Sequence, residues 1–299
     1  MSTESESVDN IFEGIEEGEI DFVLNALEES KNDSIDYKKR FDRAMEGAAK
    51  GYTSAMNELG LLYFYGKGLE KDYSKALEWF KKAADKDSAF ALYKMGGMYF
   101  YGIGVVEDKE KGFNYLLESA DKNNIEAKKE TGLILCSGKY QNRIDYKAAM
   151  KYFREAAAYN NKRAMKLVAD MYYNGYGVEK DSHEAFIWNK KAADLGDAEA
   201  TFYIFQMYLK GEGVDQDLKK AIEYCEEAAE KGVTEAMNII GIFYYQGTGV
   251  EVDKQKAKEW ITKAIDNGNN DAKVYLDKIN KEETNQTKID PPLHASIAS

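Results

Sequence analysis

The chain has 299 residues, of which 44% are hydrophobic and 31% are charged, and its formal net charge is −12 at pH 7. This acidity argues against a nucleic-acid partner, because binding a polyanion requires clustered lysines and arginines. The sequence shows neither the basic start and apolar run of a signal peptide nor an apolar stretch long enough to span a membrane. We therefore expect a cytoplasmic protein that has no membrane span.

The first 36 residues differ from the rest, because they contain twelve acids and a single base, Lys31. They carry a formal charge of −11, which leaves −1 for the remaining 263 residues. We expect residues 1–36 to form an acidic segment that is partly disordered, with short helices that cap the rest of the chain. A second interpretation is a charged arm that recruits a basic partner or screens a binding surface.

A repeat with a spacing of 36 or 37 residues fills most of the remaining chain. Six copies open at an alanine, and a partial capping copy begins at Ala272; the six alanines are Ala55, Ala91, Ala127, Ala164, Ala200 and Ala236. A period this regular is typical of a solenoid, in which each unit packs only against its neighbours. We therefore expect residues 37–280 to form one continuous all-α body, followed by a disordered tail at residues 281–299.

The copy at Ala236 predicts two helices joined by a turn. Ile239, Ile240 and Phe243 lie at intervals typical of one face of an amphipathic helix, which we call helix A. Gly241 lies inside this helix, where glycine costs about 1 kcal/mol relative to alanine, so we expect a neighbouring helix to approach closely there. Two turn glycines and a capping aspartate then lead into a second amphipathic helix, helix B.

The same turn chemistry recurs in the other copies. The predicted N-caps of helix B are Asp72, Asp108, Asp145, Asp181, Asp217 and Asp253. Helix B is predicted to end at residues that tolerate the left-handed conformation, namely Asp87, Asn123, Asn160, Gly196, Gly232 and Gly268. The third copy departs from the pattern, because it lacks the second turn glycine and is one residue longer.

The shared pattern A-x-x-x-L-G-x-x-Y-x-x-G-x-G-V-x-x-D-x-x-x-A-x-x-W-x-x-x-A-A resembles the Sel-one-like repeat (SLR), a relative of the tetratricopeptide repeat. The resemblance covers roughly Ala55 to Asn280. It implies a right-handed superhelical α/α solenoid of about six helix-turn-helix units. Members of this family act as adaptors, so the resemblance also implies a non-catalytic scaffold that binds a protein or peptide in its concave groove.

In the related tetratricopeptide fold, helix A lines the concave face, and the shared L-G-x-x-Y core transfers those positions to this chain. The candidate partner-binding residues are the aromatic ones, namely Phe64, Tyr65, Phe90, Tyr93, Phe100, Tyr101, Tyr173, Phe202 and Tyr245. Six of them belong to the first two copies, whereas the third and fourth copies place mostly charged and amide groups there. The competing interpretation is that half of the rings in the first two copies fold back as core.

The sequence carries weak signals for catalysis. Cys136 has no histidine at a defined spacing, and of the two histidines His183 lies in a turn and His294 in the tail. The turn glycines follow a helix and lack the lysine of a phosphate-binding loop. We therefore expect no enzyme activity, no cofactor and no bound metal, and the two cysteines favour a reducing compartment. The alternatives are an immunity or inhibitor protein acting through residues 1–36 and, less favoured, a hydrolase.

Overall fold

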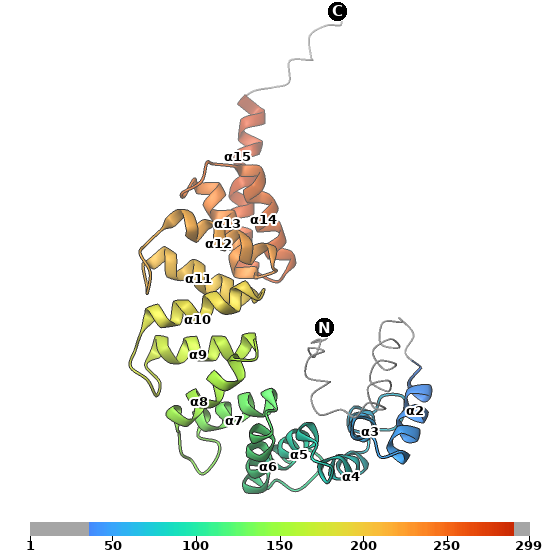
Figure 1. Ribbon diagram of the computed structural model, residues 1–299. Coiled ribbons are helices and arrows are strands. Elements are labelled where there is room, and N and C mark those ends of the chain that lie inside the picture. The colour runs from blue at the N-terminus through green and yellow to red at the C-terminus, as the bar shows by residue number, and fades with distance from the viewer. Residues whose placement is uncertain (1–35, 290–299) are drawn as a thin grey trace, which may run out of the picture. The chain divides into compact units, whose positions relative to one another are not determined.

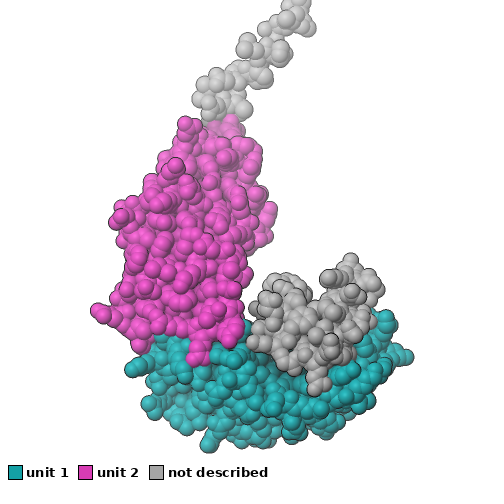
Figure 2. Space-filling view, viewed as in Figure 1, with its two compact units in different colours: residues 1–152 teal, residues 153–299 magenta. Residues whose placement is uncertain are grey.

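The computed structural model of the chain describes residues 36–289, and within that range its regular elements are all helices (Figure 1). They form two compact units, residues 1–152 (unit 1) and 153–299 (unit 2), coloured separately in Figure 2. Unit 1 contains α2 (Tyr37–Ala49), α3 (Thr53–Tyr65), α4 (Tyr73–Ala84), α5 (Ala89–Tyr101), α6 (Lys109–Asp121), α7 (Ile125–Ser137) and the start of α8 (Tyr146–Ala157). Unit 2 contains α9 (Lys162–Asn174), α10 (Ser182–Asp194), α11 (Ala198–Lys210), α12 (Leu218–Glu230), α13 (Thr234–Gln246), α14 (Lys254–Asp266), η2 (Asn270–Ala272) and α15 (Lys273–Ile289).

Each repeat forms the expected pair of helices. The odd-numbered helices α3 to α13 are helix A of the six copies, and the even-numbered helices α4 to α14 are helix B. Helix α2 precedes the first pair in the place of a helix B, and Asp36 caps it by accepting the backbone N–H groups of Lys38 and Lys39. The prediction of an all-α solenoid built from tandem helix pairs is confirmed. The rest of the predicted acidic segment, residues 1–35, lies outside the described residues.

The aspartates predicted as N-caps hold both ends of the turn between helix A and helix B. The side chain of Asp72 accepts the N–H of Lys75 at 2.9 Å, and its own N–H donates to Tyr63 O at 2.9 Å. The same pair of bonds is present at Asp108, Asp145, Asp181, Asp217 and Asp253. Each aspartate therefore starts helix B and also ties it to the end of helix A.

The irregular third copy keeps this turn by another route. Helix α7 ends at Gly138, with φ of 66°, and the longer turn then places Gln141 and Asn142 in the left-handed region. These two residues take the place of the missing second turn glycine. Asp145 still caps α8, accepting the N–H of Ala148 at 2.9 Å.

Glycines inside helix A let helix B pack closely against it. A Cβ atom on Gly241 would lie 2.7 Å from the side chain of Ile261 in α14, as the sequence analysis expected. In the first copy, a Cβ atom on Gly60 would lie 2.4 Å from the ring of Phe80 in α4. These separations are far below ordinary van der Waals contact, so a side chain at either position would force the two helices apart.

Helix α15 continues past Asn280, where the sequence analysis placed the start of a disordered tail. Glu282 accepts hydrogen bonds from Lys254 at 2.7 Å and from the hydroxyl of Tyr245 at 2.6 Å, and Glu283 pairs with Lys258 at 2.8 Å. Helix α15 runs to Ile289, so the prediction of disorder is wrong for residues 281–289, and the polar contacts of Glu282 and Glu283 join the helix to α13 and α14. Residues 290–299 lie outside the described part of the chain.

Candidate functional site

All nine candidate residues lie on helix A, but the two units treat them differently. Unit 1 holds six of them: Phe64 and Tyr65 end α3, and Phe90, Tyr93, Phe100 and Tyr101 lie in α5. Phe64 and Phe90 both pack on one core cluster of unit 1, which includes Leu59, Phe80 and Met95. Unit 2 holds the other three, one on each of α9, α11 and α13: Tyr173, Phe202 and Tyr245.

Phe100 is a core residue and cannot contact a partner. Its side chain is 1% exposed and packs with Phe113, Leu116 and Ile134. The reason lies in α6, because a Cβ atom on Gly112 would lie only 2.4 Å from the backbone nitrogen of Phe100. Without that Cβ, α6 closes over the end of α5 and covers the ring, so the prediction of Phe100 as a binding residue is wrong.

The other five rings of α3 and α5 keep some exposure, and we call them the unit 1 aromatic surface: Phe64, Tyr65, Phe90, Tyr93 and Tyr101. Tyr65 is 51% exposed and Tyr101 is 43% exposed, whereas Phe64, Phe90 and Tyr93 are half-buried. Phe64 meets Tyr65 edge-on, with 5.0 Å between ring centroids. The half-buried rings are thus fixed by the core, while the two tyrosines present ring surface to solvent.

Lysine ammonium groups lie beside these rings. Lys94 lies over Phe90 and Tyr93, with its nitrogen 5.0 Å and 5.1 Å from the two ring centroids. Lys67 lies 5.8 Å from the centroid of Tyr65, and Lys139 lies 5.9 Å from that of Tyr101. Contacts of this kind are worth about 0.5–1 kcal/mol at exposed sites. The repeat pattern does not predict the contacts of Lys67 and Lys139, because both lysines lie in turns whose path the pattern does not specify.

The hydroxyl of Tyr101 is held by a carboxylate from the next helix A. It donates a hydrogen bond to Glu130 in α7. Burial, together with this hydrogen bond, raises the pKa of the Tyr101 hydroxyl above its ordinary value. The ring is therefore neutral at physiological pH and fixed in orientation, although nearly half of its surface is exposed.

In unit 2 the three candidate rings are half-buried, and the two tyrosines bond to carboxylates. The hydroxyl of Tyr173 donates to Glu212 at 2.9 Å, and that of Tyr245 donates to Glu282 at 2.6 Å. These hydrogen bonds raise the pKa of both hydroxyls. Phe202 packs against the buried Phe205, with 5.4 Å between centroids. Unit 2 therefore offers no cluster of exposed rings at these positions.

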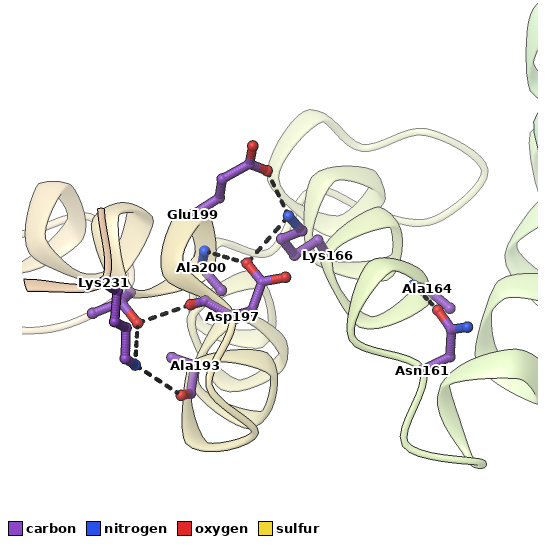
Figure 3. A network of polar contacts seen from close by, with 9 residues as sticks. Asn161, Ala164, Lys166, Ala193, Asp197, Glu199, Ala200 and Lys231 are labelled. Carbon is purple, nitrogen blue, oxygen red and sulfur yellow. Dashed lines mark hydrogen bonds and ion pairs between the residues drawn. The ribbon is translucent and has the colours of Figure 1, made fainter. Parts of the chain in front are cut away.

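A polar network occupies the corresponding positions of α9 and α11 instead (Figure 3). The ammonium of Lys166 lies 3.1 Å from Asp197 and 2.5 Å from Glu199, and Asp197 also caps α11 through the N–H of Ala200. Burial opposes the charge of Lys166, but the hydrogen bonds to Glu199 and Asp197 outweigh it and raise the pKa of the ammonium. The network joins consecutive helices A, so its charges are engaged within the protein.

Among the described residues, the two cysteines and His183 are shielded or engaged. Burial raises the pKa of the Cys136 thiol to about 11 and that of the fully buried Cys225 thiol to about 12. One ring nitrogen of His183 lies 2.8 Å from the carbonyl of Gly213, so the ring bonds to the turn of the next repeat. Cys136 belongs to unit 1 and His183 to unit 2. Among residues 36–289 no three His, Cys, Asp or Glu side chains cluster as metal ligands, and no described helix is long and apolar enough to cross a membrane.

Two shallow surface depressions lie in the C-terminal part of unit 2. One is lined by Asp277, Asn280, Lys281 and Thr284. The other is lined by Thr234, Glu235 and residues 267–271. Neither contains a candidate residue, a cysteine or a histidine, so neither adds chemistry to the site.

Comparison with known proteins identifies the family to which the repeat belongs. The Sel1 repeat profile matches residues 53–88, 89–124, 126–160, 162–197, 198–233 and 234–269. A protective antigen of uropathogenic Escherichia coli that displays an SLR fold is 31% identical, with a TM-score of 0.71 over 79% of this chain, and this chain spans half of the antigen's length. A Sel1 repeat protein from Oxalobacter formigenes is 30% identical, with a TM-score of 0.66 over 76% of this chain and 94% of its own. No curated protein matches.

Proposed function

The chain belongs to the Sel1 repeat family, and from this premise we propose that it is a non-catalytic scaffold or adaptor whose unit 1 aromatic surface binds a segment of another protein. Sel1 repeat proteins are generally protein-interaction scaffolds. The observation that carries the proposal is the pair of exposed rings, Tyr65 and Tyr101, beside three half-buried ones on α3 and α5. Covering roughly 100 Å² of this ring surface would contribute about 2.5 kcal/mol to binding, at about 25 cal/mol per Å².

The fixed orientation of the rings supports the same proposal. Binding costs free energy when side chains must be ordered, by about 0.5–1.5 kcal/mol for each mobile side chain. Tyr101 is already held by Glu130, and Tyr65 packs edge-on against Phe64. A partner would therefore meet rings that are largely ordered, which is how aromatic anchors supply much of the affinity of protein interfaces.

The test is affinity capture with the full chain from native lysate, compared with the Tyr65→Ala, Tyr101→Ala variant. The matched control is Tyr159→Ala, Tyr203→Ala, because those tyrosines are 48% and 43% exposed and lie outside the surface. We expect a protein that wild type and the control hold and that the first variant loses, identified by mass spectrometry. If the first variant holds the same proteins as wild type, the binding site is not on the unit 1 aromatic surface.

The alternative is an immunity or inhibitor protein that acts through its acidic segment. Deleting residues 1–35 removes eleven acids and keeps Asp36, which caps α2. A scaffold that binds through unit 1 should still capture its partner after this deletion. An inhibitor that acts through the segment should lose its target.

The state of the thiols and the imidazole supports a non-catalytic role. A nucleophilic cysteine needs a lowered pKa, whereas burial raises the pKa of both thiols. His183 engages a backbone carbonyl. Both cysteines are free, which supports a reducing compartment, and we propose the cytoplasm.

A further inference from the structure

Helix α5 contains two adjacent glycines, and packing explains only one of them. A Cβ atom on Gly96 would lie 2.7 Å from the side chain of Leu116, so α6 leaves no room there. A Cβ atom on Gly97 would meet no atom within 4 Å. Glycine inside a helix is unfavourable relative to alanine. Gly97 therefore weakens the helix without serving the contact between α5 and α6.

The other repeats carry a side chain at the position of Gly97. The preceding and following helices A place Leu61 and Leu133 there, both half-buried. Unit 2 has Asp170, Gln206 and Ile242 at this position. Relative to its neighbours in unit 1, α5 is thus missing one leucine side chain. The result is an open gap at Gly97, in the row of side chains that Leu61 of α3 and Leu133 of α7 continue on the neighbouring helices A.

Aromatic rings flank this gap on both sides. Tyr93 lies one helical turn before Gly97 and Tyr101 one turn after it, and side chains at such spacing are about 5–6 Å apart. Tyr93 packs on the core cluster of Phe113 and Leu116, and Tyr101 is bonded to Glu130. The walls of the gap are thus ordered and largely apolar, which suits a leucine, methionine or phenylalanine side chain.

The charges around the gap favour an acidic partner. Lys94 lies over the ring of Tyr93 and Lys139 over that of Tyr101. Among the nearby carboxylates, Glu126 pairs with Lys129 and Glu130 accepts a hydrogen bond from Tyr101. Residues 36–152 contain 21 bases and 17 acids, a formal charge of +4, whereas residues 153–299 carry −6. Residues 1–35, which also belong to unit 1, carry −10, so an acidic segment would be attracted to the described part of unit 1, residues 36–152, and repelled by residues 1–35 and by unit 2.

We propose that the gap at Gly97 receives one large apolar side chain from an acidic segment of a partner protein, and that this contact sets the specificity of the unit 1 aromatic surface. The inference rests on the proposed function and adds the class of partner. The apolar side chain fills the space that Leu61 and Leu133 fill in the neighbouring repeats. The carboxylates on either side of it lie near the lysine ammonium groups.

The probes are synthetic nine-residue peptides with four carboxylate residues on each side of a central residue that is leucine or alanine. Their binding to the full chain is measured by fluorescence anisotropy. We expect the leucine peptide to bind about tenfold more tightly than the alanine peptide, because burying the additional methylene groups favours binding. In Gly97→Leu the preference should disappear, because the new side chain fills the gap. Gln206→Leu places the same side chain at the equivalent position of unit 2 and should keep the preference.

Folding and binding are separated by two further measurements. The thermal midpoint of Gly97→Leu should equal or exceed that of wild type, because leucine favours the helix and the space is open. If that variant does not fold, Gly97→Met fills the same gap with a more flexible side chain and should also remove the preference. A folded gap-filling variant that retains the preference contradicts the proposal, as does a wild-type chain that binds both peptides equally.

Other outcomes identify which proposal has failed. If a partner captured from lysate is lost from Tyr65→Ala, Tyr101→Ala but kept by Gly97→Leu, the proposed function stands and the role of Gly97 is refuted. If both variants keep the partner, the unit 1 aromatic surface is not the binding site and both proposals fail. If the peptides bind only after residues 1–35 are deleted, the acidic segment of the chain itself occupies the gap, and the assignment to a partner protein is wrong.

Discussion

Replacing Gly112 by alanine restores the residue that the other five complete copies carry at this position, and yet it should destabilise the protein. Those copies have Ala76, Ala149, Ala185, Ala221 and Ala257, all 0% exposed. In α6, however, the new Cβ atom would lie 2.4 Å from the nitrogen of Phe100 and 2.7 Å from its Cα. These are backbone atoms, so no rotamer change relieves the clash, and α6 must move away from α5.

The magnitude depends on two opposing effects. Overpacking a close contact costs about 1–3 kcal/mol, and a clash with backbone belongs in the upper part of that range. The gain in helix propensity from glycine to alanine returns about 1 kcal/mol. We therefore expect Gly112→Ala to lose about 1–2 kcal/mol of stability. The matched control is Gly97→Ala in α5, where the same substitution enters open space and should gain about 0.4–1 kcal/mol.

The assay is urea denaturation followed by circular dichroism, combined with hydrogen exchange of the α5 and α6 backbone amides. The exchange data are needed because a repeat protein need not unfold in one cooperative step. We expect faster exchange in α5 and α6 for Gly112→Ala and slower exchange in α5 for Gly97→Ala. If Gly112→Ala is as stable as wild type, the close approach of α6 does not depend on this glycine, and our explanation for the burial of Phe100 is wrong.

Burial and pKa lead to three further predictions. Phe100→Ala should cost about 3–5 kcal/mol in the denaturation assay, because the ring is 1% exposed; a loss below about 1 kcal/mol would mean that the ring is not core. At pH 8 the thiol of Cys136 should react with a disulfide reagent about a hundredfold more slowly in the native protein than in urea, because burial raises the pKa of this thiol from 9.0 to about 11. The thiol of Cys225 should react more slowly still. Equal reaction rates in the native and unfolded protein would refute this prediction. The backbone N–H groups at the start of helix B lower the pKa of Asp72 and Asp217 below 3.8, so the stability that these caps contribute is present above that pH and is lost as the pH falls through the lowered values. Replacing both by asparagine should therefore flatten the dependence of the thermal midpoint on pH between about 5 and 3, and an unchanged slope would show that other groups cause it.

The sequence alone determined the repeat and the paired helices of its six copies, with the turns between them, because these depend on short-range rules. The N-cap at Asp72 needs only a carboxylate placed before free backbone N–H groups. The turns that follow helix B need only residues that tolerate positive φ, such as Asp87 and Asn123, where φ is 65° and 64°. The interior glycine Gly241 likewise indicated a close approach of two helices. The capping and turn rules involve only a few consecutive residues, so one copy of the repeat sufficed to state them.

The exposure of each side chain depended on tertiary structure. Phe64 and Phe100 occupy the same position of the repeat, but only Phe100 is buried, because α6 carries glycine where α4 carries Ala76. The departure at Gly112 is visible in the sequence, but its effect depends on how closely two helices approach. The position of a residue within the repeat therefore could not separate binding residues from core residues.

Two adjacent glycines show the same limit at the proposed site. Gly96 aligns with Gly60 and Gly241, so the repeat pattern predicts its close contact, 2.7 Å from Leu116, but the pattern does not specify that the adjacent Gly97 faces open space. Likewise, the sequence pattern does not specify that Lys67 and Lys139 lie over tyrosine rings, because their positions depend on how the turns fold back. Local patterns determined which helices form, whereas the distances between helices decided which side chains remain available to a partner.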